Sequence, residues 1–109
     1  MPDGLVRIVA AYVNDTKSPE RETVTLLNTA DVAVDLTGWA IADKQKKRMA
    51  LAGTIDAGGT RVVQIATPVS LSNKGGIITL LDHRGIKVHG VSYTKGQAHQ
   101  PGRTIPFQS

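Results

Sequence analysis

The sequence predicts an all-β protein, folded as an antiparallel sandwich or barrel of short strands. Apolar segments rich in Val, Ile and Thr recur along the 109 residues. Turn-forming residues, mainly Gly, Asn, Asp and Pro, separate these segments at intervals of roughly 8 to 12 residues. Several segments also alternate apolar and polar residues, which is the pattern of a strand with one face in the core and one in water.

Nine segments carry the strand signal. They are residues 5–13, 22–28, a short stretch around Val32 and Val34, 39–42, 49–55, 60–66, 77–81, 86–93 and 104–107. Side chains alternate between the two faces of a strand. We therefore expect Val6, Ile8 and Ala10 on the inner face of the first segment, and Val24 and Leu26 on the inner face of the second.

The stretch at the centre of the predicted fold contains the only tryptophan, Trp39. Asp35 and Thr37 are suited to turns in which a side-chain oxygen accepts from a nearby backbone amide, and Gly38 tolerates a positive φ. This turn leads into an alternating run in which Trp39 and Ile41 share a face. We expect both side chains to enter the core.

The second half of the chain contains a strong hairpin signal. Residues 82–85, with the sequence Asp-His-Arg-Gly, separate two strand-like runs, and Gly85 suits the left-handed position of a short loop. Tyr93, at the end of the returning strand, is expected in the core rather than as a ligand platform.

One domain is expected over residues 1–109, with its core in residues 5–93 and a C-terminal extension in residues 94–109. A chain of this length can bury one core without metals or disulfides. In the extension, the capping-box spacing that begins at Thr94 predicts one short helical turn. Pro106 restricts the final segment to a sheet edge, because proline cannot donate to a ladder.

Composition narrows the classes of function. The chain has no cysteine, which excludes a disulfide framework, a thiolate zinc site and a cysteine nucleophile. Thirteen Lys and Arg against nine Asp and Glu give a formal charge of +4, which permits attraction to phosphates or acidic proteins without requiring it. No apolar run approaches the roughly 20 residues of a membrane-spanning helix, and no signal-peptide pattern is present. We therefore expect no membrane insertion, and a cytoplasmic location if the chain is complete.

Several ordered motifs together resemble the lamin tail domain, in particular its bacterial branch. They are Glu22, Val24, Leu26 and Asn28; Asp35, Leu36, Thr37, Gly38, Trp39, Ile41 and Asp43; Leu51, Gly53, Thr54, Ile55 and Gly58; Leu71, Asn73, Gly75, Gly76, Ile78, Leu80, Asp82 and Gly85; and Val91, Ser92 and Tyr93. The resemblance implies an immunoglobulin-like antiparallel β-sandwich of about seven to nine short strands.

The resemblance also bears on function. The closing residues are similar to those of lamin-tail modules at the C-terminus of bacterial proteins, which implies an accessory domain of a larger protein. Nothing in the chain resembles a coiled-coil rod, a nuclear localisation sequence or a prenylation box. A role in nuclear filaments is therefore not implied.

No group of residues predicts catalysis, a metal site or a cofactor. His83, His89 and His99 lack a carboxylate cluster at ligand spacing. Asp35 and Asp43 flank the tryptophan, but turn capping explains the first more simply than acid–base work does. No serine lies in a nucleophile elbow.

The glycine pair in residues 73–76 could be imagined as a phosphate cradle. It lacks the spacing of a P-loop and a following helix, so a hairpin turn is favoured.

The basic segment at residues 44–48 is the one feature with a functional alternative. Lys44, Lys46, Lys47 and Arg48 are expected at an exposed hairpin tip, where lysines keep the protein soluble and discourage edge-to-edge pairing. Nonspecific binding of nucleic acid or another polyanion is the alternative, and it would be favoured if Arg61, Lys74 or Arg84 lay near the tip.

The sequence therefore predicts a non-catalytic interaction or accessory module that binds protein partners or docks on its own parent chain. A weak homodimer formed by edge-strand pairing is a further expectation of the same kind. Polyanion binding through the basic tip remains the alternative from a different class.

Overall fold

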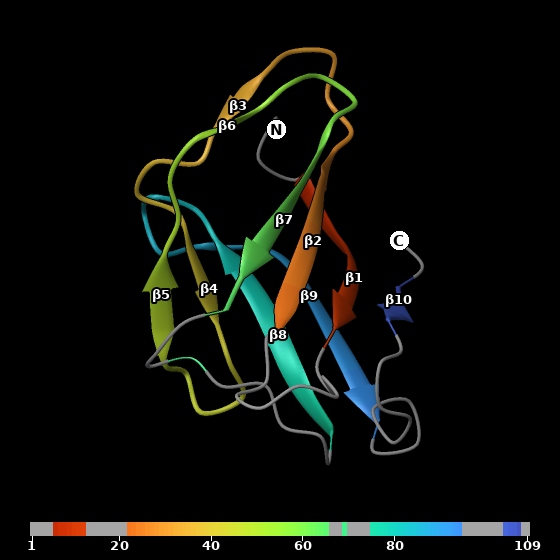
Figure 1. Cartoon of the computed structure of the whole chain (residues 1–109). Coiled ribbons are helices and arrows are strands. Elements are labelled where there is room, and N and C mark those ends of the chain that lie inside the picture. Colours follow the sequence, from red (N-terminus) through yellow and green to blue (C-terminus); the bar gives the residue numbers. More distant parts are fainter. Residues whose placement is uncertain (1–5, 13–21, 66–68, 70–74, 95–103, 108–109) are drawn as a thin grey trace.

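The fold consists of short antiparallel strands (Figure 1). In a computed structural model, residues 6–12, 22–65, 69, 75–94 and 104–107 are described. The strands within these residues are β1 (Val6–Tyr12), β2 (Thr23–Asn28), β3 (Val34–Asp35), β4 (Ala40–Ala42), β5 (Arg48–Ala50), β6 (Thr54–Ile55), β7 (Thr60–Gln64), β8 (Gly75–Leu81), β9 (Lys87–Thr94) and β10 (Ile105–Pro106). No helix long and apolar enough to cross a membrane occurs in the described residues.

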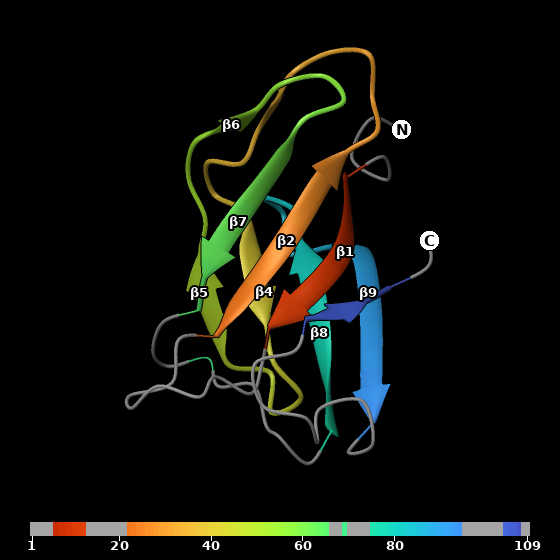
Figure 2. The ribbon, with the colours of Figure 1, turned by 45° about the vertical axis from the view of Figure 1, so that its right-hand side comes forward.

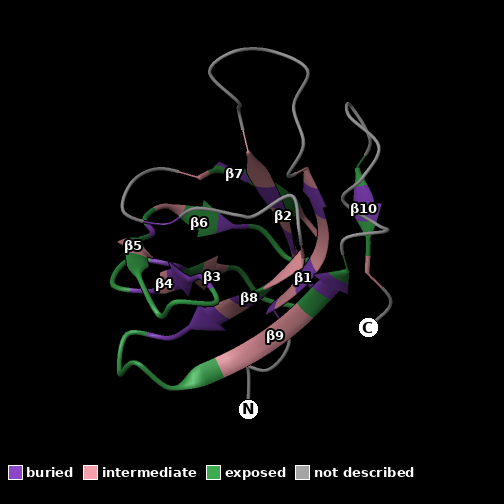
Figure 3. Cartoon of the chain, turned by 90° about the horizontal axis from the view of Figure 1, so that it is seen from below, coloured by how far each residue is buried: buried purple, intermediate pink, exposed green. Residues whose placement is uncertain are grey.

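Two four-stranded sheets face each other and form the sandwich. One has the strand order β10-β1-β2-β7 and the other β5-β4-β8-β9, while β3 and β6 make a small separate ladder. Every strand pair is antiparallel. Figure 3 views the sandwich from one end, with buried positions in purple on strands of both sheets. The predicted all-β sandwich is confirmed.

The core lies between the facing sheets and follows the expected alternation closely. Val24 and Leu26 of β2 are fully buried, whereas Thr23 and Thr25, which alternate with them, are only half-buried. The core cluster consists of Val6, Ile8, Ala11, Val24, Leu26, Leu36, Trp39, Ile41, Leu51, Ile55, Val63, Val69, Ile78, Leu80, Tyr93 and Ile105. Burial of these side chains is the main favourable contribution to folding.

A β-bulge in β1 corrects the predicted inner face of that strand. The register against β2 shifts between Ile8 and Ala10, so the alternation of the two faces is reset. Ala11 is therefore buried and Ala10 is half-buried, the reverse of the expectation for Ala10. The carbonyl of Val9, inside the bulge, accepts a hydrogen bond from the amide of Phe107 at 2.8 Å.

Two other local predictions were wrong. Val32 lies outside the short strand β3 and is 55% exposed, instead of lying on a strand with Val34. Gly75 and Gly76 are the first residues of β8 and pair with β9, instead of forming a hairpin turn. A Cβ on Gly76 would lie 2.8 Å from the Tyr93 hydroxyl, so the glycine makes room for that aromatic side chain.

The hairpin of β8 and β9 and the edge strand β10 are confirmed. The amide of Gly85 donates to the carbonyl of Asp82, and Gly85 has a φ of 76°, the left-handed conformation expected for the turn. β10 is the outer strand of its sheet. The predicted helical turn after Thr94 lies outside the described residues.

Asn28, at the end of β2, is a fully buried polar side chain that organises one end of the sandwich. Its Nδ2 donates to the carbonyl of Val32 at 2.9 Å and to that of Ile55 at 3.0 Å. A third, longer contact of 3.3 Å reaches the carbonyl of Asp56, and Oδ1 accepts from the amide of Ala30 at 3.0 Å. One side chain thus satisfies backbone groups of two separate connecting segments.

His89 joins the two sheets where β9 runs beside β1. The amide of Ile8 donates to Nδ1 of His89 at 3.0 Å, so the neutral ring carries its proton on Nε2. Burial lowers the pKa of His89, and the positive charges of Arg7 on β1 and Lys87 on β9 lower it further. Protonation of Nδ1 would remove the acceptor of this hydrogen bond.

We expect the stability of the domain to depend on pH through His89. Its pKa in the folded state lies below the ordinary value of 6.5, so between these two values the unfolded chain binds more protons. The contribution to stability is therefore complete above pH 6.5 and is lost as the pH falls towards the folded-state pKa. Urea titrations followed by Trp39 fluorescence at several pH values measure this slope.

The decisive variant is His89→Gln. It removes the titrating group and should flatten the pH dependence in this window. An unchanged slope in His89→Gln would contradict the assignment.

Candidate interaction surfaces

The basic segment forms the exposed tip of the β4–β5 hairpin. Lys44, Lys46, Lys47 and Arg48 are all exposed, whereas Asp43 at the start of the turn is buried. Oδ1 of Asp43 accepts from the amide of Gln45 at 2.9 Å and from the amide of Lys47 at 3.0 Å. The aspartate thus shapes the turn that presents the lysines.

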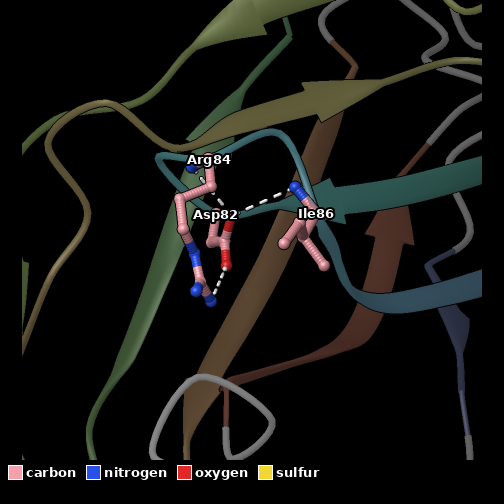
Figure 4. A network of polar contacts seen from close by, with 3 residues as sticks. All are labelled: Asp82, Arg84 and Ile86. Carbon is pink, nitrogen blue, oxygen red and sulfur yellow. Dashed lines mark hydrogen bonds and ion pairs between the residues drawn. The ribbon is translucent and has the colours of Figure 1, made fainter.

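The β8–β9 turn repeats this arrangement (Figure 4). Oδ1 of Asp82 accepts from the amides of Arg84 and Ile86 at 2.9 and 3.0 Å, and its Oδ2 accepts from the Arg84 guanidinium at 3.1 Å. Burial raises the pKa of Asp82, but the hydrogen bonds from Ile86 and Arg84 and the charge of Arg84 outweigh it, so the pKa is lowered. In both turns the fourth residue has a positive φ: 66° at Lys46 and 76° at Gly85.

The structure does not gather the basic residues into one patch. Ala40 pairs with Leu81 and Ala42 with Thr79, so β4 and β8 run in opposite directions. The two turns therefore lie at opposite ends of their sheet (Figure 1).

Arg48, one of the predicted tip residues, directs its guanidinium to the other turn, where it would lie 3.5 Å from a Cβ on Gly85. The cations expected to reinforce the tip also lie elsewhere. The Arg61 guanidinium lies over Gly53, and Arg84 binds Asp82. Lys74 is outside the described residues. Of the four predicted tip residues, the three lysines are therefore the ones whose charges we assign to the tip.

The turn at residues 35–38 has a structural role. Oδ1 of Asp35 accepts a hydrogen bond from the backbone amide of Thr37 at 2.9 Å. Hydrogen bonds from the backbone and the side chain of Thr37 lower the pKa of Asp35, and they outweigh the opposite effect of burial. Gly38 packs closely on His83, because a Cβ there would lie 3.2 Å from the Cβ of His83. Trp39 then enters the core.

Ile41 and Tyr93 are also core residues, on β4 and β9, the two strands that flank β8 in the second sheet. Ile41 is fully buried on β4. Burial raises the pKa of Tyr93 to about 12, and the charge of Glu22 acts in the same direction. Tyr93 therefore stays neutral at physiological pH.

The candidate metal-binding histidines do not meet. His83 packs against Gly38, His89 accepts from the Ile8 amide, and His99 lies outside the described residues. In the part of the chain that the structure describes, no three His, Cys, Asp or Glu side chains are grouped in a way that could hold a metal ion.

The outer strands of the two large sheets differ in how their free edges are protected. β10 carries Pro106, which has no amide hydrogen to offer to an incoming strand. β5 is three residues long and begins with the charged Arg48. β9 lies beside β1 and contacts it through His89. In Figure 2, β7 is the outer strand next to β2.

The hydrogen bonds at the two ends of the β2–β7 ladder define its pattern. The amide of Asn28 donates to the carbonyl of Gly59 at 2.9 Å, and the amide of Ile65 donates to the carbonyl of Glu22 at 2.8 Å. These two residue pairs continue the register of the strand pairs that lie between them. Hydrogen-bonded and non-hydrogen-bonded pairs alternate in an antiparallel ladder. Counting from either end, the hydrogen-bonded pairs are therefore those of Gly59, Arg61, Val63 and Ile65 with β2 and its flanking residues.

This alternation shows which backbone groups of β7 face away from the sheet. Arg61 and Val63 direct their amide and carbonyl groups to β2, whereas Thr60, Val62 and Gln64 direct theirs to the outer edge. These last three residues are exposed and uncharged, and the side chain of Val62 is 63% exposed. Among the described residues, no strand pairs with this edge.

Sequence reasoning did not identify β7 as a candidate site. Its strand was predicted, but which strand lies at an edge depends on the order of strands in the sheet. The detectable signal is the outward series Thr60, Val62 and Gln64, which lacks the lysine, glutamate or proline that commonly protects an exposed edge.

Comparison with known proteins agrees with the fold. Residues 4–95 match the family described as Lamin Tail Domain, which covers most of the 109 residues. The chain therefore belongs to the lamin tail domain family, a non-catalytic, immunoglobulin-like class of domain that serves generally in protein interaction.

Other comparisons add little. A solved structure described as the X-ray structure of Northeast Structural Genomics Consortium target SoR45 is 20% identical, covers 94% of this chain and 92% of its own, and has a TM-score of 0.33. No curated protein matches the chain.

The two aspartate turns generate a prediction about stability. Lys46 occupies a left-handed conformation that costs a non-glycine residue about 1 kcal/mol. We expect Lys46→Gly to raise the free energy of unfolding by about 0.5 to 1 kcal/mol, because relief of strain exceeds the added entropy of the unfolded chain. Urea denaturation followed by Trp39 fluorescence measures the change.

Two variants serve as controls. Lys46→Ala removes the same charge without relieving the strain and should change stability little, while Gly85→Ala should lower it by about 1 kcal/mol. If Lys46→Gly is no more stable than Lys46→Ala, the conformational explanation is wrong.

Proposed function

We propose that this domain is a non-catalytic interaction module that binds an extended segment of a protein partner, or of its own parent chain, along β7. The observation that carries the proposal is the outward series of backbone groups at Thr60, Val62 and Gln64. An added strand would complete hydrogen bonds that β7 directs away from β2. Membership of the lamin tail domain family supports the general class of function.

The side chains of β7 suit such a segment. Val62 offers an exposed apolar contact at the middle of the strand, and Thr60 and Gln64 flank it with neutral polar groups. Arg61 does not project from the edge, because its guanidinium lies over Gly53. An incoming strand would therefore meet backbone groups and one valine rather than a charge.

A synthetic strand peptide tests this proposal. The probe is a nonapeptide of alternating threonine and valine capped by glutamates, titrated into the isotopically labelled chain and followed by NMR. We expect the amide signals of Val62 and Gln64 to shift and their hydrogen exchange to slow. The amide of Val63, already directed to β2, should change little.

The decisive variant is Val62→Pro, which removes an outward amide and leaves the ladder with β2 intact. It should abolish peptide binding, whereas Val32→Lys, at a similarly exposed valine outside the strands, should not. If Val62→Pro fails to fold, Gln64→Pro makes the same test near the strand end. Absence of binding, or binding unaffected by these proline variants, would refute the proposal.

The second candidate is nonspecific polyanion binding by the β4–β5 tip. Lys44, Lys46 and Lys47 are exposed, and no ion pair joins any of them to a described residue. Three phosphate contacts would make the affinity for duplex DNA fall about 40-fold between roughly 50 and 200 mM salt.

Titration of duplex DNA at several salt concentrations tests this candidate. Lys46→Glu combined with Lys47→Glu should remove binding, while Lys87→Glu, at the opposite end of the sheet, should weaken it much less. Lack of binding at low salt, or binding that the double variant does not change, would eliminate polyanion binding by the tip.

A further inference from the structure

We infer that β7 also pairs with β7 of a second copy of this chain, antiparallel and with Val62 on the two-fold axis. This inference rests on the proposed function, because it names one partner for the same edge. It follows from the direction of the backbone groups and from the symmetry of the side chains along the strand.

The backbone groups of β7 are arranged for symmetric pairing. Val62 directs its amide and carbonyl to the outer edge, as derived from the ladder with β2. When two such edges meet antiparallel about Val62, each Val62 amide lies opposite the other copy's Val62 carbonyl. Thr60 and Gln64 then lie opposite each other on either side, and their outward groups form the next hydrogen-bonded pairs.

The side chains are compatible with the same register. Val62 would contact Val62 of the second copy, which covers a valine that is 63% exposed in the single chain. Residues directly opposite each other interact, and like charges at such positions are destabilising. Here Thr60 meets Gln64, so no like charges face each other. Arg61 is turned towards Gly53 and does not approach the axis.

Other outer strands are less suited to self-pairing. β5 offers only three residues for pairing, and β10 carries Pro106 within its two residues. β9 contacts β1 through His89. Pairing through β7 would instead continue the β10-β1-β2-β7 sheet into the corresponding sheet of the second copy.

The dimer is expected to be weak. Two five-residue strands bury much less than the roughly 1,200 Å² that stable interfaces require. Sedimentation velocity between about 10 μM and 1 mM covers the range in which such an association is visible. We expect the sedimentation coefficient to rise with concentration from that of a monomer towards that of a dimer.

A charge-swap experiment tests the register. Val62→Lys and Val62→Glu should each weaken dimerisation about 5-fold or more, because like charges would meet on the axis. An equimolar mixture of the two variants should recover association, since lysine then faces glutamate. Val32→Lys is the matched control and should dimerise as the unaltered chain does.

The outcomes separate this inference from the proposed function. Val62→Lys brings no like charge against the strand peptide, whose only charged side chains are its terminal glutamates, so it should retain peptide binding while losing self-association. A chain that stays monomeric throughout, or a dimer that neither charged variant weakens, would overturn the inference, and peptide binding sensitive to Val62→Pro would still support the proposed function. If the mixture of the two charged variants associates while neither variant associates by itself, residue 62 of one copy faces residue 62 of the other.

Discussion

The arrangement of this sandwich depends most on the hydrogen bonds made by the side-chain amide of Asn28. This side chain is fully buried and hydrogen-bonds the backbone of two segments, the one that follows β2 and the one that leads from β6 to β7. The same residue's backbone amide donates to Gly59, immediately before β7. Asn28 thus helps set the register of β7 against β2. An apolar residue of similar size could fill this space, but it would leave the carbonyls of Val32 and Ile55 without this donor.

Buried aspartates likewise provide hydrogen-bond partners for backbone groups at the turns. Asp43 and Asp82 each occupy the first position of a hairpin turn and accept two backbone amides through one carboxylate oxygen. The two turns share a backbone conformation but differ at the fourth position, where one has Lys46 and the other Gly85. The lysine at the tip of β4 and β5 is therefore held in a strained conformation, whereas the glycine of the other turn adopts its conformation at low cost.

Protection of the sheet edges links this architecture to interaction. A sandwich has outer strands, and each one exposes backbone groups that can pair with another chain. Pro106, the short charged strand β5 and the contact of His89 with β1 reduce this tendency at three of them. β7 lacks a comparable device among the described residues. This difference is the physical basis for assigning interaction to β7 rather than to the more conspicuous basic tip.

The sequence by itself determined the class of fold, most strands, the buried position of Trp39 and the left-handed turn at Gly85, because alternation and turn chemistry are local properties. The tertiary structure decided features that depend on residues distant in the chain. The bulge exchanged the environments of Ala10 and Ala11, and the ring of Tyr93 explains Gly76. The antiparallel order of β4 and β8 separated the two basic turns, and the position of β7 beside β2 left its outer backbone groups exposed. Strand order and register are set by packing across the whole core, and a local pattern cannot specify them.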